Sequence, residues 1–214
     1  MQHDFRYVSK NEAKEAKKVL IETIHKVQDI VRDDFTFNYW FIGSSARNMI
    51  TYDAKSNIGF DFDVNIQVND ESEEYSPEEI KRIIRLAFDK VVPGYGYDYC
   101  EDSTRVLTIK FKKHNLPAVL HSCDFAIVYN CKDGREQYIR YNKKQRSYTW
   151  EYQPKGYALL PQKINWLKSN GLWNELCDYY IEKKNKNFNP DKHSRAIFAE
   201  AVAEMCQKYG YHNE

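Results

Sequence analysis

Two stretches of the sequence decide the fold: FIGSSARN at residues 41–48 and DFDVNIQV at residues 61–68. The first predicts a strand that ends in a tight turn at Gly43 and Ser44 and continues as a short helix over Ser45–Ile50. The second alternates apolar and polar residues, which predicts a strand with one buried face and one polar face. The remaining elements are arranged around this pair of strands.

The polar face of the second strand carries two carboxylates, Asp61 and Asp63. Side chains two residues apart on a strand lie on the same side, about 7 Å apart along the chain. Such carboxylates repel each other unless a cation lies between them, and carboxylate oxygens suit Mg²⁺ or Mn²⁺. Asp124 is the only charged residue in the apolar strand predicted over Ala118–Tyr129, and it becomes a third metal ligand if the two strands are neighbours. Three carboxylates can hold two metal ions for phosphoryl transfer.

The turn before this strand predicts a phosphate site. Gly43 allows the backbone to approach a ligand closely, and Ser44 begins the predicted short helix, whose N-terminus favours phosphate. Arg47, one helical turn later, is a further candidate to bind phosphate. Lys183 follows an amphipathic helix and is the candidate from the C-terminal part of the chain to bind a triphosphate.

Composition limits the protein class. The chain has 214 residues and a formal net charge of +1, which excludes a protein that coats nucleic acid by charge alone. No run approaches the roughly 18 apolar residues of a membrane helix, and the N-terminus has no apolar signal segment. The five cysteines form no CxxC pair. We therefore expect a cytoplasmic protein with reduced thiols and no membrane partner.

The order of the elements predicts an α+β fold, a mixed sheet flanked by helices and followed by a C-terminal helical segment. We expect a core over residues 1–155 and the helical segment, packed on that core, over residues 156–214. The predicted elements are a helix over Asn11–Asp33 capped by Asn11, a strand over Phe35–Ile42, a polar connection over Thr51–Gly59, a helix with a capping box at Ser76, strands over Arg105–Lys112 and Ala118–Tyr129, further strand within Gln137–Trp150, and helices from Pro161 onward.

These motifs resemble the nucleotidyltransferase superfamily, whose members share a core like that of DNA polymerase beta. The resemblance covers roughly residues 35–129 and rests on the glycine-serine turn, the paired aspartates and the later aspartate in an apolar strand. It implies that Asp61 and Asp63 bind both metals, that Asp124 supports the catalytic metal and activates the acceptor hydroxyl, and that the turn holds the triphosphate. The superfamily includes antibiotic nucleotidyltransferases, minimal toxins and antitoxins, CCA-adding enzymes, and oligoadenylate and cyclic-dinucleotide synthases.

The sequence departs from the minimal members in two places. Sixteen residues separate Ser44 from Asp61, and Asn48 stands where minimal members usually have glycine. Asparagine tolerates the left-handed backbone that glycine also adopts. The departures are compatible with the fold, and they indicate that the protein is not a minimal member.

The implied function is transfer of a nucleoside monophosphate from an NTP such as ATP to an acceptor hydroxyl, with release of pyrophosphate. The acceptor stays open between a small molecule, a protein, a tRNA and a second nucleotide. An alternative is a non-catalytic member that binds a nucleotide or a partner, or a component of a toxin–antitoxin or antiphage system. His121 and Cys123 share a strand face, but we expect them to be structural residues and not zinc ligands.

Overall fold

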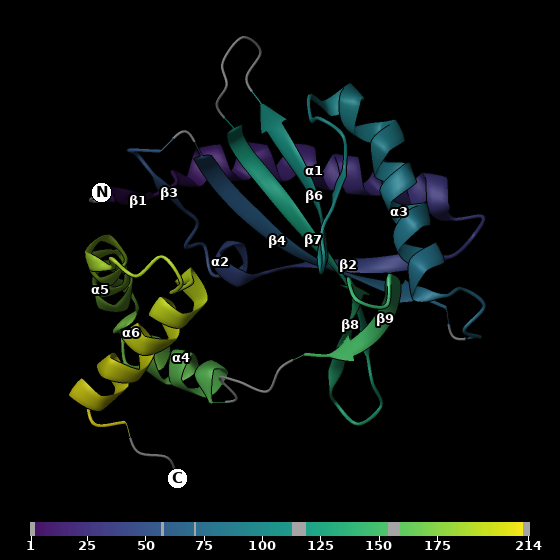
Figure 1. The fold of residues 1–214 in the computed structure, drawn as a ribbon. Coiled ribbons are helices and arrows are strands. Elements are labelled where there is room, and N and C mark those ends of the chain that lie inside the picture. The colour runs from purple at the N-terminus through teal and green to yellow at the C-terminus, as the bar shows by residue number, and fades with distance from the viewer. Residues whose placement is uncertain (1–2, 57, 71, 113–118, 154–158, 212–214) are drawn as a thin grey trace. The chain divides into compact units, whose positions relative to one another are not determined.

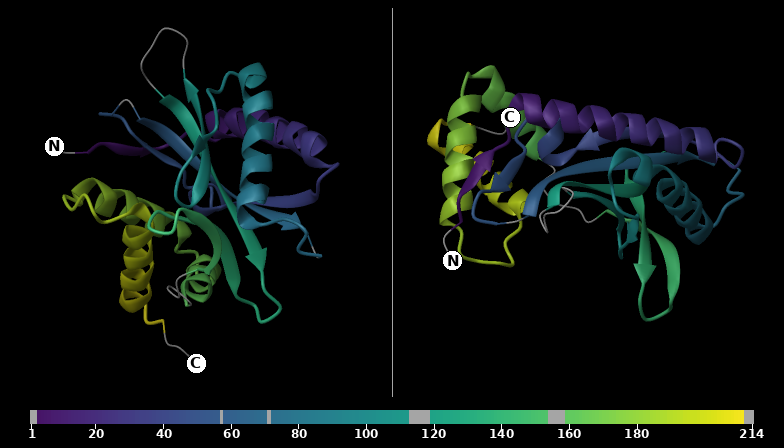
Figure 2. Two further views of the ribbon diagram at one scale, coloured as in Figure 1. Left: turned by 45° about the vertical axis from the view of Figure 1, so that its right-hand side comes forward. Right: turned by 90° about the horizontal axis from the view of Figure 1, so that it is seen from above.

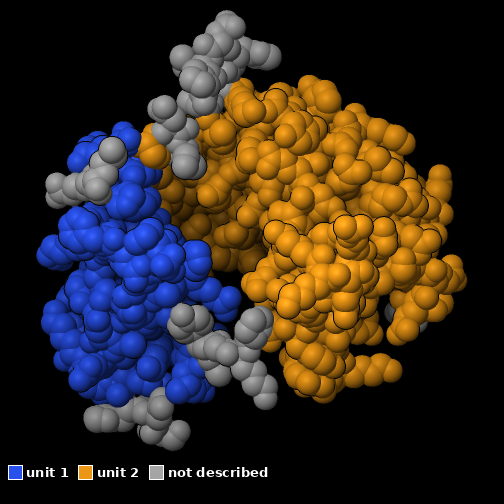
Figure 3. All heavy atoms as spheres, viewed as in Figure 1, with its two compact units in different colours: residues 1–6, 53–55, 154–214 blue, residues 7–52, 56–153 orange. Residues whose placement is uncertain are grey.

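A computed structural model describes residues 3–56, 58–70, 72–112, 119–153 and 159–211. The chain forms two compact units (Figure 3). The sheet unit comprises residues 7–52 and 56–153, and the helical unit comprises residues 1–6, 53–55 and 154–214. The domain boundary after residue 155 stays a prediction.

The sheet unit is built on a mixed sheet (Figure 1). Its strands follow the order β2-β4-β7-β6-β5, and the hairpin β8–β9 continues from β7. Strands β4 and β7 run parallel, whereas the other neighbouring pairs are antiparallel. The mixed sheet and its flanking helices confirm the predicted fold class. The strands are β2 (Thr36–Ile42), β4 (Ile58–Asn69), β5 (Glu101–Asp102), β6 (Val106–Lys112), β7 (Val119–Asn130), β8 (Glu136–Asn142) and β9 (Ser147–Tyr152).

Two helices cover one face of this sheet, α1 (Lys10–Val31) and α3 (Pro77–Val91), with the 3₁₀ helix η1 (Val92–Tyr95) after α3 (Figure 2). Apolar residues of both helices pack against the apolar face of β4 and β7 in one core. Burying such side chains contributes roughly 1.5–3 kcal/mol each, so this face fixes the register of the central strands. The central core residues are Leu20, Ile24, Phe62, Val64, Ile66, Ile84, Phe88 and Phe125.

The structure settles how the two long helices begin. The hydroxyl of Ser9 accepts a hydrogen bond from the Glu12 amide at 3.2 Å, so the predicted cap at Asn11 is wrong. Ser9 has extended backbone and reaches the first free amides, whereas Asn11 already lies inside the helix. At α3 the predicted capping box is confirmed, because Ser76 and Glu79 bond each other's backbone amides.

The segment that connects β2 to β4 differs from the prediction. The short helix α2 spans Gly43–Ala46 and not Ser45–Ile50. Asn48 has left-handed backbone with φ of 55°, which ends the helical conformation. The stretch predicted as a polar connection holds the strand β3 (Thr51–Asp53), which pairs with β1 (Phe5–Tyr7), and the beginning of β4.

The helical unit consists of α4 (Leu160–Ser169), α5 (Trp173–Lys186) and α6 (Ser194–Lys208), as the periodicity after Pro161 predicts. The N-terminal segment adds to it, since the Phe5 amide donates to Asn185 Oδ1 at 2.6 Å and the Lys184 ammonium lies 4.1 Å from the Phe5 ring. Among the described residues, no helix has the length and apolar character needed to cross a membrane. The buried residues of the three helices include Leu167, Leu176, Tyr180, Phe198 and Val202.

Candidate active site

The three predicted aspartates share one face of two neighbouring strands. The alternation of β4 buries Phe62 and Val64 in the core and leaves Asp61 and Asp63 on the opposite face. Strands β4 and β7 run parallel, and their register makes Asp63 the direct partner of Asp124. Neighbouring strands lie about 4.8 Å apart, so their side chains are within electrostatic reach of each other. We call this surface the acidic face.

Two hydroxyl groups donate hydrogen bonds to carboxylates of the acidic face. Ser122, the β7 partner of Asp61, donates a hydrogen bond to Asp61 Oδ1. Thr108 of β6, the partner of Asp124, donates to Asp124 Oδ1 at 2.6 Å. Neither hydroxyl was predicted to belong to the site. The alternation of β7 places Ser122 and Asp124 on one face, but the role of Thr108 depends on the register of β6, which the sequence does not show.

Gly43 lies directly against one of the carboxylates. It has left-handed backbone with φ of 63°, and a Cβ atom at this position would lie 2.5 Å from Asp63 Oδ2. Strand pairing explains the contact, because Ile42, the residue before the turn, is the β2 partner of Asp63. The turn and the acidic strand are therefore adjacent, and their shared role as a binding site stays a prediction.

The two serines of the turn have different environments. Ser45 is buried, and its hydroxyl donates to the Ile42 carbonyl at 3.1 Å, which stabilises the turn. The Ser44 side chain is half-buried and makes no hydrogen bond within the described part of the chain. Since α2 has only four residues, its dipole is small, and any phosphate contact has to come from the backbone amides of the turn and the Ser44 hydroxyl.

Burial, together with the charges of Asp124 and Asp61, raises the pKa of Asp63 to about 6. The positive charge of Arg47 opposes this shift. Burial also raises the pKa of Asp124, although the hydrogen bond from Thr108 opposes it. The acidic face therefore concentrates negative charge that Arg47 and Lys110 offset only in part, and a bound cation would relieve it.

The donor set of this face fits a hard cation such as Mg²⁺ or Mn²⁺, because it offers carboxylate and hydroxyl oxygens from adjacent strands. Within the described ranges, no three His, Cys, Asp or Glu side chains converge closely enough to form a ready metal site.

Lys183, predicted to bind the triphosphate, belongs to the helical unit. Its ammonium bonds both carboxylate oxygens of Glu204, at 2.6 and 2.7 Å, and lies 3.7 Å from Glu200. Partial burial works against the charged form, but the hydrogen bond to Glu204 and the charges of Glu204 and Glu200 together raise the pKa of Lys183. Its role toward a nucleotide stays a prediction.

The residues expected to be structural lie inside the sheet unit. His121 and Cys123 are buried, and the His121 ring stacks on Phe111 with centroids 4.9 Å apart. Burial lowers the pKa of His121 to about 4, so the ring is neutral at pH 7. Burial likewise raises the pKa of the Cys123 thiol. An uncharged ring and a protonated thiol in an aromatic cluster are typical of core residues.

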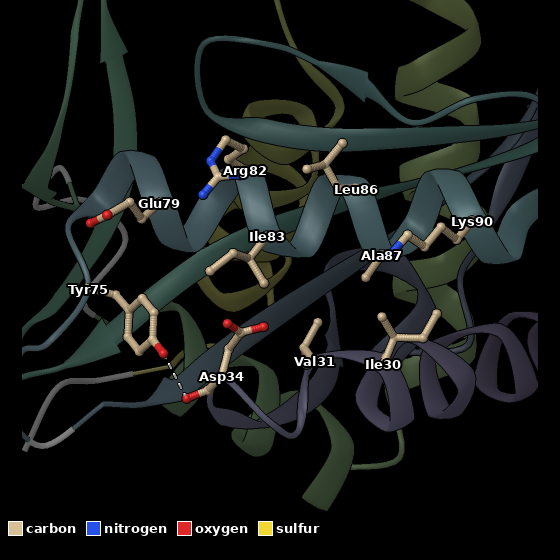
Figure 4. A pocket seen from close by; sticks show the side chains of 10 residues that line it. All are labelled: Ile30, Val31, Asp34, Tyr75, Glu79, Arg82, Ile83, Leu86, Ala87 and Lys90. Carbon is tan, nitrogen blue, oxygen red and sulfur yellow. Dashed lines mark hydrogen bonds between the residues drawn. The ribbon is translucent and has the colours of Figure 1, made fainter.

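A cavity of about 360 Å³ lies elsewhere on the sheet unit, between α1 and α3 (Figure 4). Ile30, Ile83 and Leu86 contribute apolar surface, and the Tyr75 hydroxyl closes one end by donating to the Asp34 carbonyl at 3.2 Å. Because α1 and α3 cover the apolar face of the sheet, this cavity is separate from the acidic face.

Comparisons with solved structures identify the fold. The DncV cyclic AMP-GMP synthase of Vibrio cholerae, a prokaryotic cGAS homolog, matches with a TM-score of 0.66 at 10% identity, over 96% of this chain and 69% of its own. Its GTP-bound form matches with a TM-score of 0.59 at 14% identity, over 97% of this chain and 54% of its own. Escherichia coli DncV bound to 3′-deoxy GTP matches with a TM-score of 0.55 at 15% identity, over 97% of this chain and 55% of its own.

No family model matches the sequence, and no curated protein matches it. The chain spans little more than half the length of the nucleotide-bound DncV structures. At this level of identity the likeness establishes the architecture alone. The chain has the fold of the DncV synthases. This is the nucleotidyltransferase fold, which the glycine-serine turn and the aspartates of the sequence predict.

Proposed function

We propose that the protein is a metal-dependent nucleotidyltransferase. It transfers a nucleoside monophosphate from an NTP to an acceptor hydroxyl and releases pyrophosphate. The observation that carries this proposal is the contact between Gly43 and Asp63, because it joins a turn suited to phosphate to a face of three carboxylates. Among the functions open to this fold, metal-assisted transfer explains why three acids share one face of two neighbouring strands.

Each residue has a distinct role in this proposal. Ser44 and the amides of the turn bind the β- and γ-phosphates, and Arg47 adds a positive charge beside them. Asp61, Asp63 and Asp124 hold Mg²⁺ or Mn²⁺, which supplies charge neutralisation at the phosphates. Asp124, on the strand beside Asp63, accepts the proton of the acceptor hydroxyl. The acceptor oxygen then bonds to the α-phosphorus while the bond to the leaving pyrophosphate breaks.

A second nucleotide is the acceptor that has specific support. The matched structures belong to a cyclic AMP-GMP synthase, and one of them holds the linear intermediate 5′-pppA(3′,5′)pG. On this proposal the product is a nucleotide-nucleotide phosphodiester, linear or cyclic. The three other acceptor classes are a small molecule, a protein and a tRNA, and a cytoplasmic location suits all of them.

The test is incubation of the full chain with each α-labelled NTP and Mg²⁺ or Mn²⁺, followed by separation of the products. We expect a labelled phosphodiester with wild type and none with Asp63→Asn. Asp33→Asn is the matched control, because Asp33 is exposed in the turn after α1. Binding of an NTP without any labelled product, over all four NTPs and the three other acceptor classes, would instead favour the non-catalytic alternative.

A further inference from the structure

The hydroxyl groups on the acidic face suggest how the site chooses its cation. Asp61 and Asp124 each have their Oδ1 atom bonded to a hydroxyl from a neighbouring strand, Ser122 in one case and Thr108 in the other. Strand register determines both contacts, since each hydroxyl belongs to the direct cross-strand partner of the carboxylate that it bonds. Ser122 is 9% exposed, so its hydroxyl has few partners other than Asp61.

We propose that Ser122 and Thr108 are positioning residues that make the site selective for Mg²⁺ and Mn²⁺ over Ca²⁺. A carboxylate with one oxygen held by a hydroxyl offers a cation its other oxygen. Mg²⁺ and Mn²⁺ accept single carboxylate oxygens in a compact octahedral shell, whereas Ca²⁺ takes six to eight oxygens and is well served by carboxylates that bind through both. This inference rests on the metal site of the proposed function and adds the residues that restrict it.

The two hydroxyls also orient their carboxylates. Asp61 and Asp124 repel each other and Asp63, so without the hydrogen bonds their side chains would turn apart. Partners that orient metal ligands typically change metal affinity 10–100-fold when they are removed. A hydroxyl that only satisfied a buried carboxylate would affect stability, but it would not change the preference between two cations of equal charge.

The test measures cation affinity without turnover. Mn²⁺ binding is followed by its electron paramagnetic resonance signal, and Ca²⁺ binding by competition, for wild type, Ser122→Ala, Thr108→Val and the double variant. Ser147→Ala and Thr149→Val are the matched controls, because these β9 side chains make no hydrogen bond among the residues that the structure describes. Thr108→Ser keeps the hydroxyl and is the conservative variant.

We expect Mn²⁺ affinity to fall about tenfold in the double variant while Ca²⁺ affinity stays equal or rises. Thr108→Ser and both controls should keep the wild-type ratio of the two affinities. Equal losses for both cations, or an unchanged ratio in every variant, would overturn the inference. If Thr108→Val fails to fold, Thr108→Ser and Ser122→Ala still decide it, since the first must keep the ratio and the second must change it.

The outcome separates this inference from the proposed function. Wild type that binds Mn²⁺ and forms a phosphodiester, with variants of unchanged selectivity, overturns the role of the two hydroxyls alone. Wild type that binds neither cation, with or without an NTP, overturns the metal site and this inference with it. A cation selectivity that wild type shows and the variants lose, in a protein without nucleotide transfer, supports the hydroxyl roles and removes the enzymatic proposal.

Discussion

Replacement of Gly43 allows the effect on transfer activity to be compared with the effect on the free energy of unfolding. The Gly43 backbone is left-handed, and any Cβ would meet Asp63 Oδ2 at 2.5 Å. We expect Gly43→Ala to lower transfer activity at least about tenfold and to cost about 1–2 kcal/mol of unfolding free energy, from backbone strain and displacement of the carboxylate. Labelled-NTP transfer and chemical unfolding measure the two effects.

Gly134 provides the matched control. It has the same kind of backbone, with φ of 79°, but no atom lies within 4 Å of a Cβ built there. Gly134→Ala should therefore show the strain without the activity loss. Equal activity of Gly43→Ala and wild type would contradict the contact between the turn and the acidic face.

The raised pKa of Asp63 predicts how the free energy of unfolding depends on pH. This pKa is about 6 in the folded chain and 3.8 in the reference state, so the folded state binds the proton more tightly. Below about pH 4 Asp63 is protonated in the folded chain, so its burial carries no charge penalty. As pH rises through 6 the folded chain loses this proton, and the free energy of unfolding falls by the full cost of burying the ionised carboxylate. Asp63→Asn should be more stable relative to wild type at pH 8 than at pH 4, by up to about 3 kcal/mol.

Chemical unfolding of both proteins at the two pH values measures this difference. The subtraction cancels the contribution of titrating groups that do not act on Asp63, such as His121, because they occur unchanged in both chains. A difference in unfolding free energy that does not change with pH would show that Asp63 ionises in the folded chain as it does in the unfolded chain.

Sequence alone predicts that Asp61, Asp63 and Asp124 lie together, because a charge alternating with core residues, or standing alone in an apolar strand, is visible in the chain. It could not identify Thr108, whose partnership with Asp124 depends on how β6 pairs with β7. Register arises from long-range packing and not from local pattern. The same reason hid the contact between Gly43 and Asp63, which depends on the pairing of β2 with β4.

At the scale of elements, a buried lysine joins three segments of the sheet unit. Lys81 of α3 is 2% exposed, and its ammonium donates to the Ser103 carbonyl and pairs with Asp102 of β5, both at 2.7 Å. The Tyr148 hydroxyl of β9 donates to the same carboxylate at 2.7 Å. Burial lowers the pKa of Lys81, and the bond to Asp102 opposes that shift. The network ties α3, β5 and the β8–β9 hairpin together.

Removing the ammonium takes the cation from Asp102, which keeps only the hydrogen bond from Tyr148, and the Lys81 donor from the Ser103 carbonyl. We expect Lys81→Ala to cost about 3 kcal/mol of unfolding free energy, which thermal or chemical unfolding measures. Lys90→Ala, an exposed lysine on the same helix, should change it by no more than about 0.5 kcal/mol. Equal effects of the two substitutions would mean that the network does not stabilise the unit.

The long elements could be predicted and the short ones could not. Helix α3 and strands β4 and β7 carry enough periodic residues to define their faces. The two-residue strand β5 and the three-residue strands β1 and β3 have no period to detect, and pairing alone creates them. Helix α2 was placed too late in the chain, because the backbone of Asn48 and not its apolar neighbours decides where it ends.

At the scale of the whole molecule, Lys183, which the sequence predicts to bind the triphosphate, belongs to the helical unit. If it binds the NTP, Lys183→Ala should raise KM for the NTP about tenfold with little change in kcat, because the lost contact contributes to binding. Lys186→Ala is the control, since this lysine is exposed and pairs with Glu182 on the same helix. Steady-state kinetics distinguishes the two variants, and an unchanged KM would leave Lys183 as a partner of Glu204 only.

The central claim is that the three carboxylates perform nucleotidyl transfer. Pyrophosphate release from an NTP by the full chain with Mg²⁺, compared between wild type and Asp63→Asn, tests it most directly. We predict steady release by wild type and Asp33→Asn, and a loss of at least about 1,000-fold in Asp63→Asn, although that variant is at least as stable at pH 8. Release at the wild-type rate by folded Asp63→Asn would contradict the account.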